Sequence, residues 1–106
     1  MAPSGAGKWT VTYRFQATLW RWKGEAPASW VFVTLPADVA FAIKCQAERR
    51  AWGSVKVTAC IGDTRFQTSL FPEKASRSYL LPVKAAVRKA EGLHDGEVVE
   101  VELTTD

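Results

Sequence analysis

Two segments of the chain share an arrangement that restricts the fold more than any other feature of the sequence. They are VTLPADVAFAI at 33–43 and YLLPVKAAVRK at 79–89, which align through Leu-Pro pairs 46 residues apart. In both, an extended stretch precedes a proline, which suits the first position of a helix because the N–H that it lacks needs no partner there. The apolar positions match only loosely, since Val39 falls on Ala85. This repeat of strand, Leu-Pro, short helix and strand predicts a barrel with internal pseudo-twofold symmetry.

Alternation of apolar and polar residues predicts the strands. From Trp9 to Leu19 the odd positions are apolar and the even ones polar, which is typical of a strand with one buried face. A turn around Gly24–Pro27 leads to a second strand, Ser29–Leu35, rich in β-branched and aromatic residues. The other expected strands are Val55–Ile61, then Arg65–Leu70 after a turn at Gly62–Thr64, Tyr79–Leu81, and a last strand containing Val99, Val101 and Leu103.

One short helix is expected after each proline, the first starting at Pro36 and the second at Pro82. Gly92 is placed to end the second helix in the left-handed conformation, and Leu93 to fold back onto its last turn. Between the fourth and fifth strands, Phe71–Arg77 is expected to be a loop. The apolar stripes of the helices are Val39, Ile43 and Ala47 in the first and Val83, Val87 and Ala90 in the second.

These elements predict a single-domain, mainly β protein with two short helices. The expected architecture is a six-stranded closed or nearly closed β-barrel, since closure removes exposed sheet edges. Residues 1–8 are interpreted as a flexible N-terminal tail of small residues and 9–106 as the barrel domain. A chain of 106 residues can bury a core without disulfides or metal.

Charge is distributed unevenly along the chain. Residues 1–90 hold all 14 Lys and Arg and five acids, a net charge of +9, whereas residues 91–106 hold six acids and a net charge of −6. In a compact fold these two regions can lie side by side and cancel. The basic excess is therefore weak support for a polyanionic partner.

Features that report on cellular location point to the cytoplasm. No apolar run approaches the roughly 20 residues that span a bilayer, and MAPSGAGK at 1–8 lacks the apolar core of a secretory signal. Cys45 and Cys60 form no CxxC pair and are expected to be reduced, buried thiols. A cytoplasmic protein without membrane association is therefore expected.

The sequence offers no catalytic constellation. SGAGKWT at 4–10 resembles a phosphate-binding loop, but Ala2 and Trp9 stand where that motif needs glycine and Ser or Thr. His94, the only histidine, is interpreted as a solvated turn residue, because the adjacent Asp95 is poorly placed to orient it. One histidine and two separated cysteines make a poor metal-ligand set, and the acids of the last strand fit a solvent-facing row better than a glycosidase pair. We expect no enzyme activity, no cofactor and no metal.

Trp20 and Trp22 are the best candidates for a binding site. Both fall on the even, otherwise polar face of the first strand, next to Arg21 and Lys23. Two interpretations stay open: a β-bulge or the end of the barrel turns both indoles inward, or LWRWK presents two flat aromatic faces suited to stacking a base or a sugar. Of the other tryptophans, Trp9 is interpreted as core, and Trp30 and Trp52, which flank strands, as core or rim.

The second helix carries a small basic surface, formed by Lys84, Arg88 and Lys89. A helix with an apolar stripe needs a polar back, and cations in the last turn suit the helix dipole, so we favour a solvated face over a binding handle. Three positive charges also fall short of the basic stripe typical of a DNA reader. The acids of the following strand would moreover repel phosphate.

The order and spacing of four segments resemble domain-of-unknown-function family 1905. They are FQATLWRW, SWVFVTLP, WGSVKVTACIGDTRFQTSLFP and YLLPVKAAVRKAEGLHDGEVVEVEL, which together cover Phe15–Leu103. The resemblance implies a small β-barrel from a mainly bacterial family whose function is not established, and it carries no catalytic residues over. The chain departs from the family pattern at Glu97, where members often have Asp, and at Arg77-Ser78, where they tend to have glycine.

A shorter segment, LPVKAAVRKAEGLHDGEVVEV at 81–101, is similar to the half-barrel unit of AbrB-type transcription factors. Those proteins dimerise to bind DNA, and here both halves would lie in one chain. This similarity implies nucleic-acid binding as an alternative function.

We therefore carry three functional hypotheses. The first is a binding or interaction module of unknown ligand, with a protein or small-molecule partner, acting as a monomer or weak homodimer. The second is weak or non-specific nucleic-acid binding, and the third, an enzyme, has the least support. The candidate contact residues are Trp20, Trp22, Arg49, Arg50 and Arg65, followed by Lys84 and Arg88.

Overall fold

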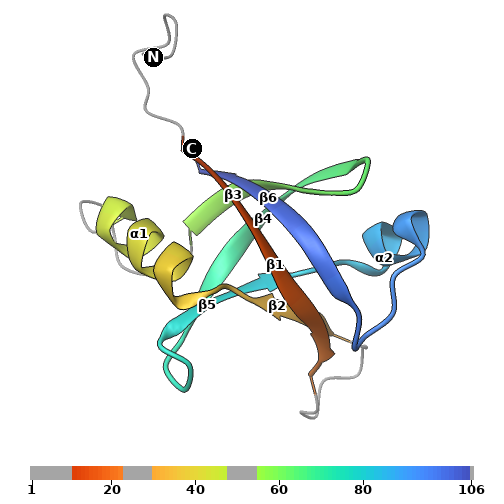
Figure 1. The fold of residues 1–106 in the computed structure, drawn as a ribbon, viewed down its shortest axis with the longest axis horizontal. Coiled ribbons are helices and arrows are strands. Elements are labelled where there is room, and N and C mark those ends of the chain that lie inside the picture. The colour runs from red at the N-terminus through yellow and green to blue at the C-terminus, as the bar shows by residue number, and fades with distance from the viewer. Residues whose placement is uncertain (1–10, 23–29, 48–54, 106) are drawn as a thin grey trace, which may run out of the picture.

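Six antiparallel strands close into a barrel in the order β1-β2-β5-β4-β3-β6 (Figure 1). The computed structural model describes residues 11–22, 30–47 and 55–105. The two helices lie on opposite sides of the barrel (Figure 1). The elements are β1 (Thr12–Arg21), β2 (Val31–Thr34), α1 (Ala37–Ala47), β3 (Val55–Ile61), β4 (Thr64–Glu73), β5 (Ser78–Pro82), α2 (Ala85–Glu91) and β6 (Val98–Thr105).

The two longest strands, β1 and β4, each change partner along their length and so join two halves of the barrel wall. Residues 12–18 of β1 pair with β6, whereas 19–21 pair with β2. Residues 64–70 of β4 pair with β3, whereas 71–73 pair with β5. The wall therefore has one side built on β6 and β3 and another built on β2 and β5.

The internal repeat predicted from the two Leu-Pro segments is present in the topology. Each half consists of two strands, a short helix and a third strand: β1-β2-α1-β3 and then β4-β5-α2-β6. The two halves meet where β2 pairs with β5, and Thr34 there lies opposite Leu80. These two residues are equivalent in the sequence alignment, so the pseudo-twofold axis passes through their pairing.

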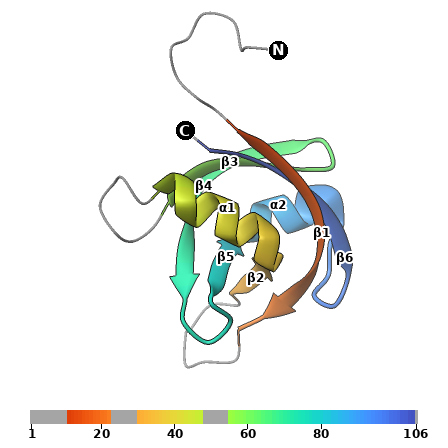
Figure 2. The same cartoon turned by 60° about the vertical axis from the view of Figure 1, so that its left-hand side comes forward.

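The core fills the inside of the barrel, and both helices contribute to it. Alternate residues of β1 point inward, where Phe15 and Leu19 are buried, as the period-two pattern predicted. Helix α1 covers one open end of the barrel (Figure 2) and buries Ala40 and Ile43 in the same core. Helix α2 buries Val87. The mainly β barrel with two short helices, predicted as a single domain, is confirmed.

The end of α2 also follows the prediction. Gly92 adopts φ 65° and ψ 39°, the left-handed conformation, just after the last helical residue. The Leu93 N–H donates to the Arg88 carbonyl oxygen at 2.8 Å, which closes the final turn. Leu93 packs partly buried against the core. Neither described helix has the length and apolar composition needed to cross a bilayer.

Several local predictions were wrong. Phe71–Glu73 was expected in a loop but continues β4, and Pro82 was expected to start α2 but ends β5, so that the helix begins only at Ala85. Ala90 was assigned to the apolar stripe and is exposed. In both segments an antiparallel partner holds the proline in a strand: Pro72 pairs with Tyr79, and Pro82 pairs with Phe32.

The cysteines differ from expectation in burial. Both are free thiols, but Cys45 is exposed and Cys60 is half-buried, so the prediction of buried thiols was wrong. Cys60 lies on the outward side of β3, because its neighbours Ala59 and Ile61 take the inward positions. The predicted tail at 1–8 and Trp9 lie outside the described residues.

Candidate functional site

Four aromatic side chains meet on the outside of the barrel where β1 pairs with β2. Trp20 lies directly opposite Phe32 in the register of the two strands. Two residues further on, the Trp22 N–H donates to the Trp30 carbonyl oxygen at 2.7 Å, so that these two residues also face each other. Directly opposed residues of an antiparallel pair share one face of the sheet. None of the four belongs to the core cluster inside the barrel.

The Phe32 ring is the centre of this group. Its centroid lies 5.4 Å from that of Trp20 and 6.2 Å from that of Trp22, the latter in an edge-to-face arrangement. Trp30 stacks on it with an interplanar angle of 13° and a centroid distance of 6.0 Å. Such pairs each add about 0.5–1.5 kcal/mol beyond the area that they bury. Phe32 therefore holds three indoles in fixed relative positions.

The indoles differ in exposure. Trp22 and Trp30 are 44% and 45% exposed, whereas Trp20 is half-buried between its neighbours. The Trp20 indole Nε1 donates a hydrogen bond to the Thr34 hydroxyl Oγ1 at 2.9 Å. The interpretation in which both Trp20 and Trp22 turn inward is wrong, since β1 keeps its regular pairing as far as Arg21. Both indoles lie on the outer surface.

The apolar surface continues from β2 across β5 to β4. Pro82 lies opposite Phe32, and Leu80 lies opposite both Thr34 and Phe71. Leu80 is buried although it stays outside the core cluster, and Phe71 is 44% exposed. We call this outer surface of β1, β2, β5 and β4 the aromatic face; its apolar residues are Trp20, Trp22, Trp30, Phe32, Phe71, Leu80 and Pro82.

Arg65 lies on a different part of the outer wall. It is opposite Cys60, which is opposite Glu102, which in turn is opposite Arg14. The Arg14 Nε donates to the Glu102 Oε2 at 3.0 Å. This outer surface of β1, β6, β3 and β4, which we call the polar face, also carries Thr12 hydrogen-bonded to Thr104. The structure therefore separates Arg65 from the tryptophans.

Lys84 lies next to the aromatic face. The Val83 N–H donates to the Val31 carbonyl oxygen at 2.9 Å, which extends the β2–β5 pairing by one residue. The next residue after Val83 is Lys84, and the residue before Val31 in the opposite strand direction is Trp30, so these two lie opposite each other. The Lys84 side chain is exposed, and its backbone is extended, with φ −65° and ψ 155°. The sequence ranked it second, but among the described basic candidates it is the one that the strand register places beside Trp30.

Arg88 has a local role. Its Nε donates to the Val83 carbonyl oxygen at 3.2 Å, which folds the guanidinium back along α2. The side chain is half-buried. Arg88 thus satisfies a carbonyl at the start of its own helix, as expected of a structural residue. Arg49 and Arg50, and also Trp52, lie outside the described residues.

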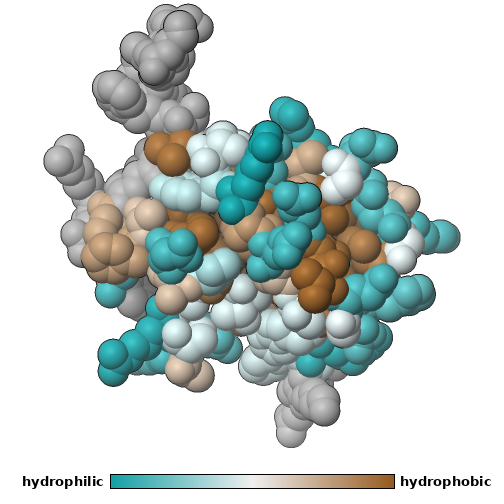
Figure 3. All heavy atoms as spheres, viewed as in Figure 1, coloured by the Kyte–Doolittle hydropathy of each residue, from teal (hydrophilic) through white to brown (hydrophobic). Residues whose placement is uncertain are grey.

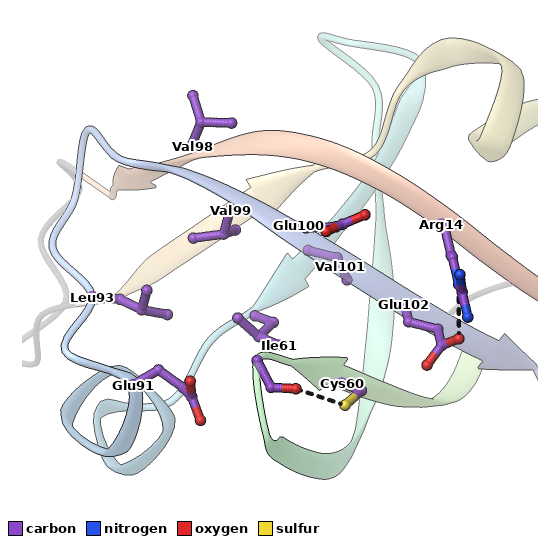
Figure 4. A pocket seen from close by; sticks show the side chains of 11 residues that line it. Arg14, Cys60, Ile61, Glu91, Leu93, Val98, Val99, Glu100, Val101 and Glu102 are labelled. Atoms are coloured by element: carbon purple, nitrogen blue, oxygen red, sulfur yellow. Dashed lines mark hydrogen bonds and ion pairs between the residues drawn. The ribbon is translucent and has the colours of Figure 1, made fainter.

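A separate hollow of about 450 Å³ lies between the start of β6, the β3–β4 turn and α2 (Figure 4). On this side of the molecule hydrophobic side chains gather beside α2 and hydrophilic ones surround them (Figure 3). Glu91 reaches from α2 toward the turn, where its Oε2 accepts hydrogen bonds from the Thr64 hydroxyl at 2.5 Å and the Asp63 N–H at 3.2 Å. The Glu91 carboxylate, which lines the hollow, is thus engaged in holding the turn.

His94, the histidine considered for catalysis, lies in the turn between α2 and β6. His94 is exposed, and its backbone N–H donates to the Glu97 Oε1 at 2.6 Å. Among residues 11–22, 30–47 and 55–105, no three His, Cys, Asp or Glu side chains gather as a metal ion would require. Burial raises the pKa of the Tyr13 and Tyr79 phenols above their ordinary value.

Trp30, Phe32 and Phe71 were not predicted from the sequence to form one surface. A signal was present within Ser29–Leu35, because Trp30 and Phe32 occupy even positions while the aliphatic Val31, Val33 and Leu35 occupy odd ones. What the sequence lacked was the register, which decides that Trp30 and Phe32 face Trp22 and Trp20.

Comparison with known families supports the resemblance noted in the sequence. The sequence profile of the family described as Domain of unknown function (DUF1905) matches residues 15–103. The match spans all six strands and both helices except for the outer ends of β1 and β6. No curated protein matches this chain. With its barrel and most of its length covered by that profile, the chain belongs to the DUF1905 family.

Proposed function

We propose that this protein is a binding module and that the aromatic face is its contact surface. The observation that carries the proposal is the half-exposure of Trp22 and Trp30, held side by side on neighbouring strands by Phe32. Large apolar side chains grouped on the surface of a soluble domain mark interaction sites more often than scattered ones do. Tryptophan is also enriched among the residues that dominate binding energies.

Binding is preferred to catalysis because the polar groups near this surface already serve the fold. The Thr34 hydroxyl accepts from Trp20, and the Ser78 hydroxyl donates to the Leu35 carbonyl oxygen at 2.8 Å. On the other faces, His94 lies in a hydrogen-bonded turn and Glu91 holds the β3–β4 turn. These placements favour a role without bond-making chemistry.

We also propose that the protein acts in the bacterial cytoplasm, which is a reducing compartment. In support, Cys45 is an exposed free thiol, which an oxidising compartment would expose to disulfide exchange. Fractionation of the native host with an antibody against the protein tests this part. Recovery in the periplasmic or extracellular fraction would contradict it.

The binding proposal is tested with three probes of different chemistry: the single-stranded oligonucleotide dT12, chitohexaose and a random hydrophobic dodecapeptide mixture. The indole N–H resonances of Trp22 and Trp30 are followed by two-dimensional NMR during each titration. We expect at least one probe to shift both resonances saturably, and Trp22→Ala to weaken that binding at least fivefold. Phe41→Ala is the matched control, since Phe41 is 67% exposed but lies on α1. Three flat titrations would overturn the proposal.

A further inference from the structure

We propose that the aromatic face binds single-stranded nucleic acid, with bases stacked on Trp22 and Trp30 and phosphates held by the cations at its two ends. This inference rests on the proposed function and names its ligand. It draws on the shape of the face and on the charges that border it.

The shape of the face suits stacking. Trp22 and Trp30, which lie just beyond the paired ends of β1 and β2, each expose nearly half of their surface. Protein partners anchor side chains in pockets, whereas unpaired bases stack on flat aromatic groups that stand open on a sheet. The bases of a duplex are stacked on each other, so a duplex cannot use this surface in the same way.

The arrangement of the rings leaves the indoles ready for a ligand. Phe32 supports Trp30 from one side by stacking and Trp22 by an edge contact, so neither indole must be ordered when a base arrives. Pre-ordered contact groups reduce the entropic cost of binding. Stacking on aromatic side chains is also tolerant of base identity, so we expect little sequence preference.

The charges at the borders of the face favour an anionic ligand. Lys84 follows Pro82 at the end near Trp30, and Lys74 and Arg77 lie in the turn that joins β4 to β5 at the other end. Among the described residues these three cations form no ion pair. The described acid at these two ends is Glu73, whose Oε1 accepts from the Ser76 hydroxyl at 2.6 Å, and the ion pair of Arg21 with Asp95 on the β1 side adds no net charge. The border therefore has an excess of two positive charges.

The distance between the two ends fits a short strand of nucleotides. Six residues lie between Arg77 and Lys84, and most of them are extended, so the seven steps span roughly 20 Å at about 3.3 Å per residue. The half-exposed Phe71 lies between the two ends. A neutral oligosaccharide would stack on the indoles but gain nothing from these cations, so the charges argue for a phosphate-bearing ligand.

The test is fluorescence anisotropy of labelled dT12 and of a 12-base-pair duplex, each titrated with the full chain at several salt concentrations. We expect dT12 to bind at least fivefold more tightly than the duplex. With three phosphate contacts on a single strand, affinity should fall about twentyfold between 50 and 200 mM salt. Absence of dT12 binding at 50 mM salt, or preference for the duplex, would overturn the inference.

Variants separate stacking from charge. Trp22→Leu with Trp30→Leu keeps an apolar cover and removes the flat rings. The lost ring contacts with Phe32 should lower the melting temperature by several degrees, so affinity is measured where the variant is fully folded, and there we expect at least a tenfold loss. Lys84→Gln should weaken dT12 binding about threefold to fivefold and make its salt dependence shallower. Arg65→Gln is the matched control, because it removes the same charge from the polar face. Wild-type affinity in the leucine variant, or equal losses in the two charge variants, would sink the idea.

Competition distinguishes this inference from the broader proposal. Polyglutamate should fail to displace dT12, since it carries charge without bases; displacement at equal charge concentration would show that the face reads charge alone and would overturn the inference. Trp22-dependent binding of chitohexaose or peptide in the absence of dT12 binding would leave the binding module standing while removing its nucleic-acid ligand.

Discussion

The indole of Trp20 donates to the hydroxyl of Thr34 at 2.9 Å, and this bond ties β1 to β2 beneath the two exposed tryptophans. Trp20 is half-buried, so its N–H has limited access to water once the bond is lost. The bond thus supports both the fold and the geometry of the candidate surface.

Replacing Thr34 by valine is therefore expected to destabilise the protein by about 1–2 kcal/mol, because it leaves the Trp20 N–H without its partner. Urea unfolding measures the change. Thr12→Val is the matched control on the polar face, where the hydroxyl bond to Thr104 is exposed, and we expect a change within about 0.5 kcal/mol there. Equal losses of stability in both variants would show that the Trp20–Thr34 bond contributes no more than the exposed Thr12–Thr104 bond.

Gly62 should tolerate substitution less well than Gly92, although both have positive φ. A Cβ on Gly62 would overlap the Glu91 carboxylate that holds the turn, whereas a Cβ on Gly92 would meet nothing within 4 Å. We expect Gly92→Ala to cost about 1 kcal/mol from backbone strain. Gly62→Ala should cost about 1–2 kcal/mol more, because the Glu91 side chain must move aside and lose its hydrogen bonds to the turn. Thermal unfolding of the two variants ranks them, and a smaller loss at Gly62 would contradict the close packing of α2 on the turn.

Arg77 is expected to be a site where glycine stabilises the protein. Its φ of 55° makes it the non-glycine residue with positive φ among those described, in the turn between β4 and β5. Glycine adopts this conformation without the Cβ clash, so Arg77→Gly should raise stability by about 0.5–1 kcal/mol. Arg77→Ala removes the same charge but keeps the strain and should give no gain. A loss of stability in the glycine variant would refute the argument.

Alkaline pH should destabilise the fold through the buried Tyr79. Burial raises the pKa of the Tyr79 phenol above its ordinary value of 10.0. Because the folded state then favours the neutral phenol, the contribution of Tyr79 to stability is complete below pH 10 and is lost as the pH rises toward the folded pKa. Unfolding free energies measured from pH 8 to 11 should fall less steeply in Tyr79→Phe than in wild type. Parallel pH curves would exclude this contribution.

Much of the fold was predictable because alternation reports burial directly. The inward positions of Phe15 and Leu19 and the left-handed cap at Gly92 follow from local sequence alone. The prolines were misleading, because Pro72 and Pro82 lie within strands and the sequence suggested a loop and a helix start. Proline lacks a donor, but strand pairing decided both segments: Pro72 lies opposite Tyr79 in the next strand, and Pro82 lies opposite Phe32, which is far away in the sequence.

The candidate site was predictable only in part for the same reason. Trp20 and Trp22 were identified because they break the polar pattern of β1. Arg65 joined the list on charge, and register places it across the wall opposite Cys60. The contact between Trp22 and Trp30 depends on the pairing of two strands, which a residue pattern within one strand does not contain.

The pseudo-twofold arrangement of the barrel has a consequence for how the chain can be cut and rejoined. The first half passes to the second through the tight turn between β3 and β4. At the equivalent place β6, which ends the second half, lies beside β1, which begins the first, with Thr104 opposite Thr12. A circular permutant that links β6 to β1 and opens the chain between Gly62 and Asp63 would exchange the order of the halves. The barrel itself would keep every strand neighbour that it has now.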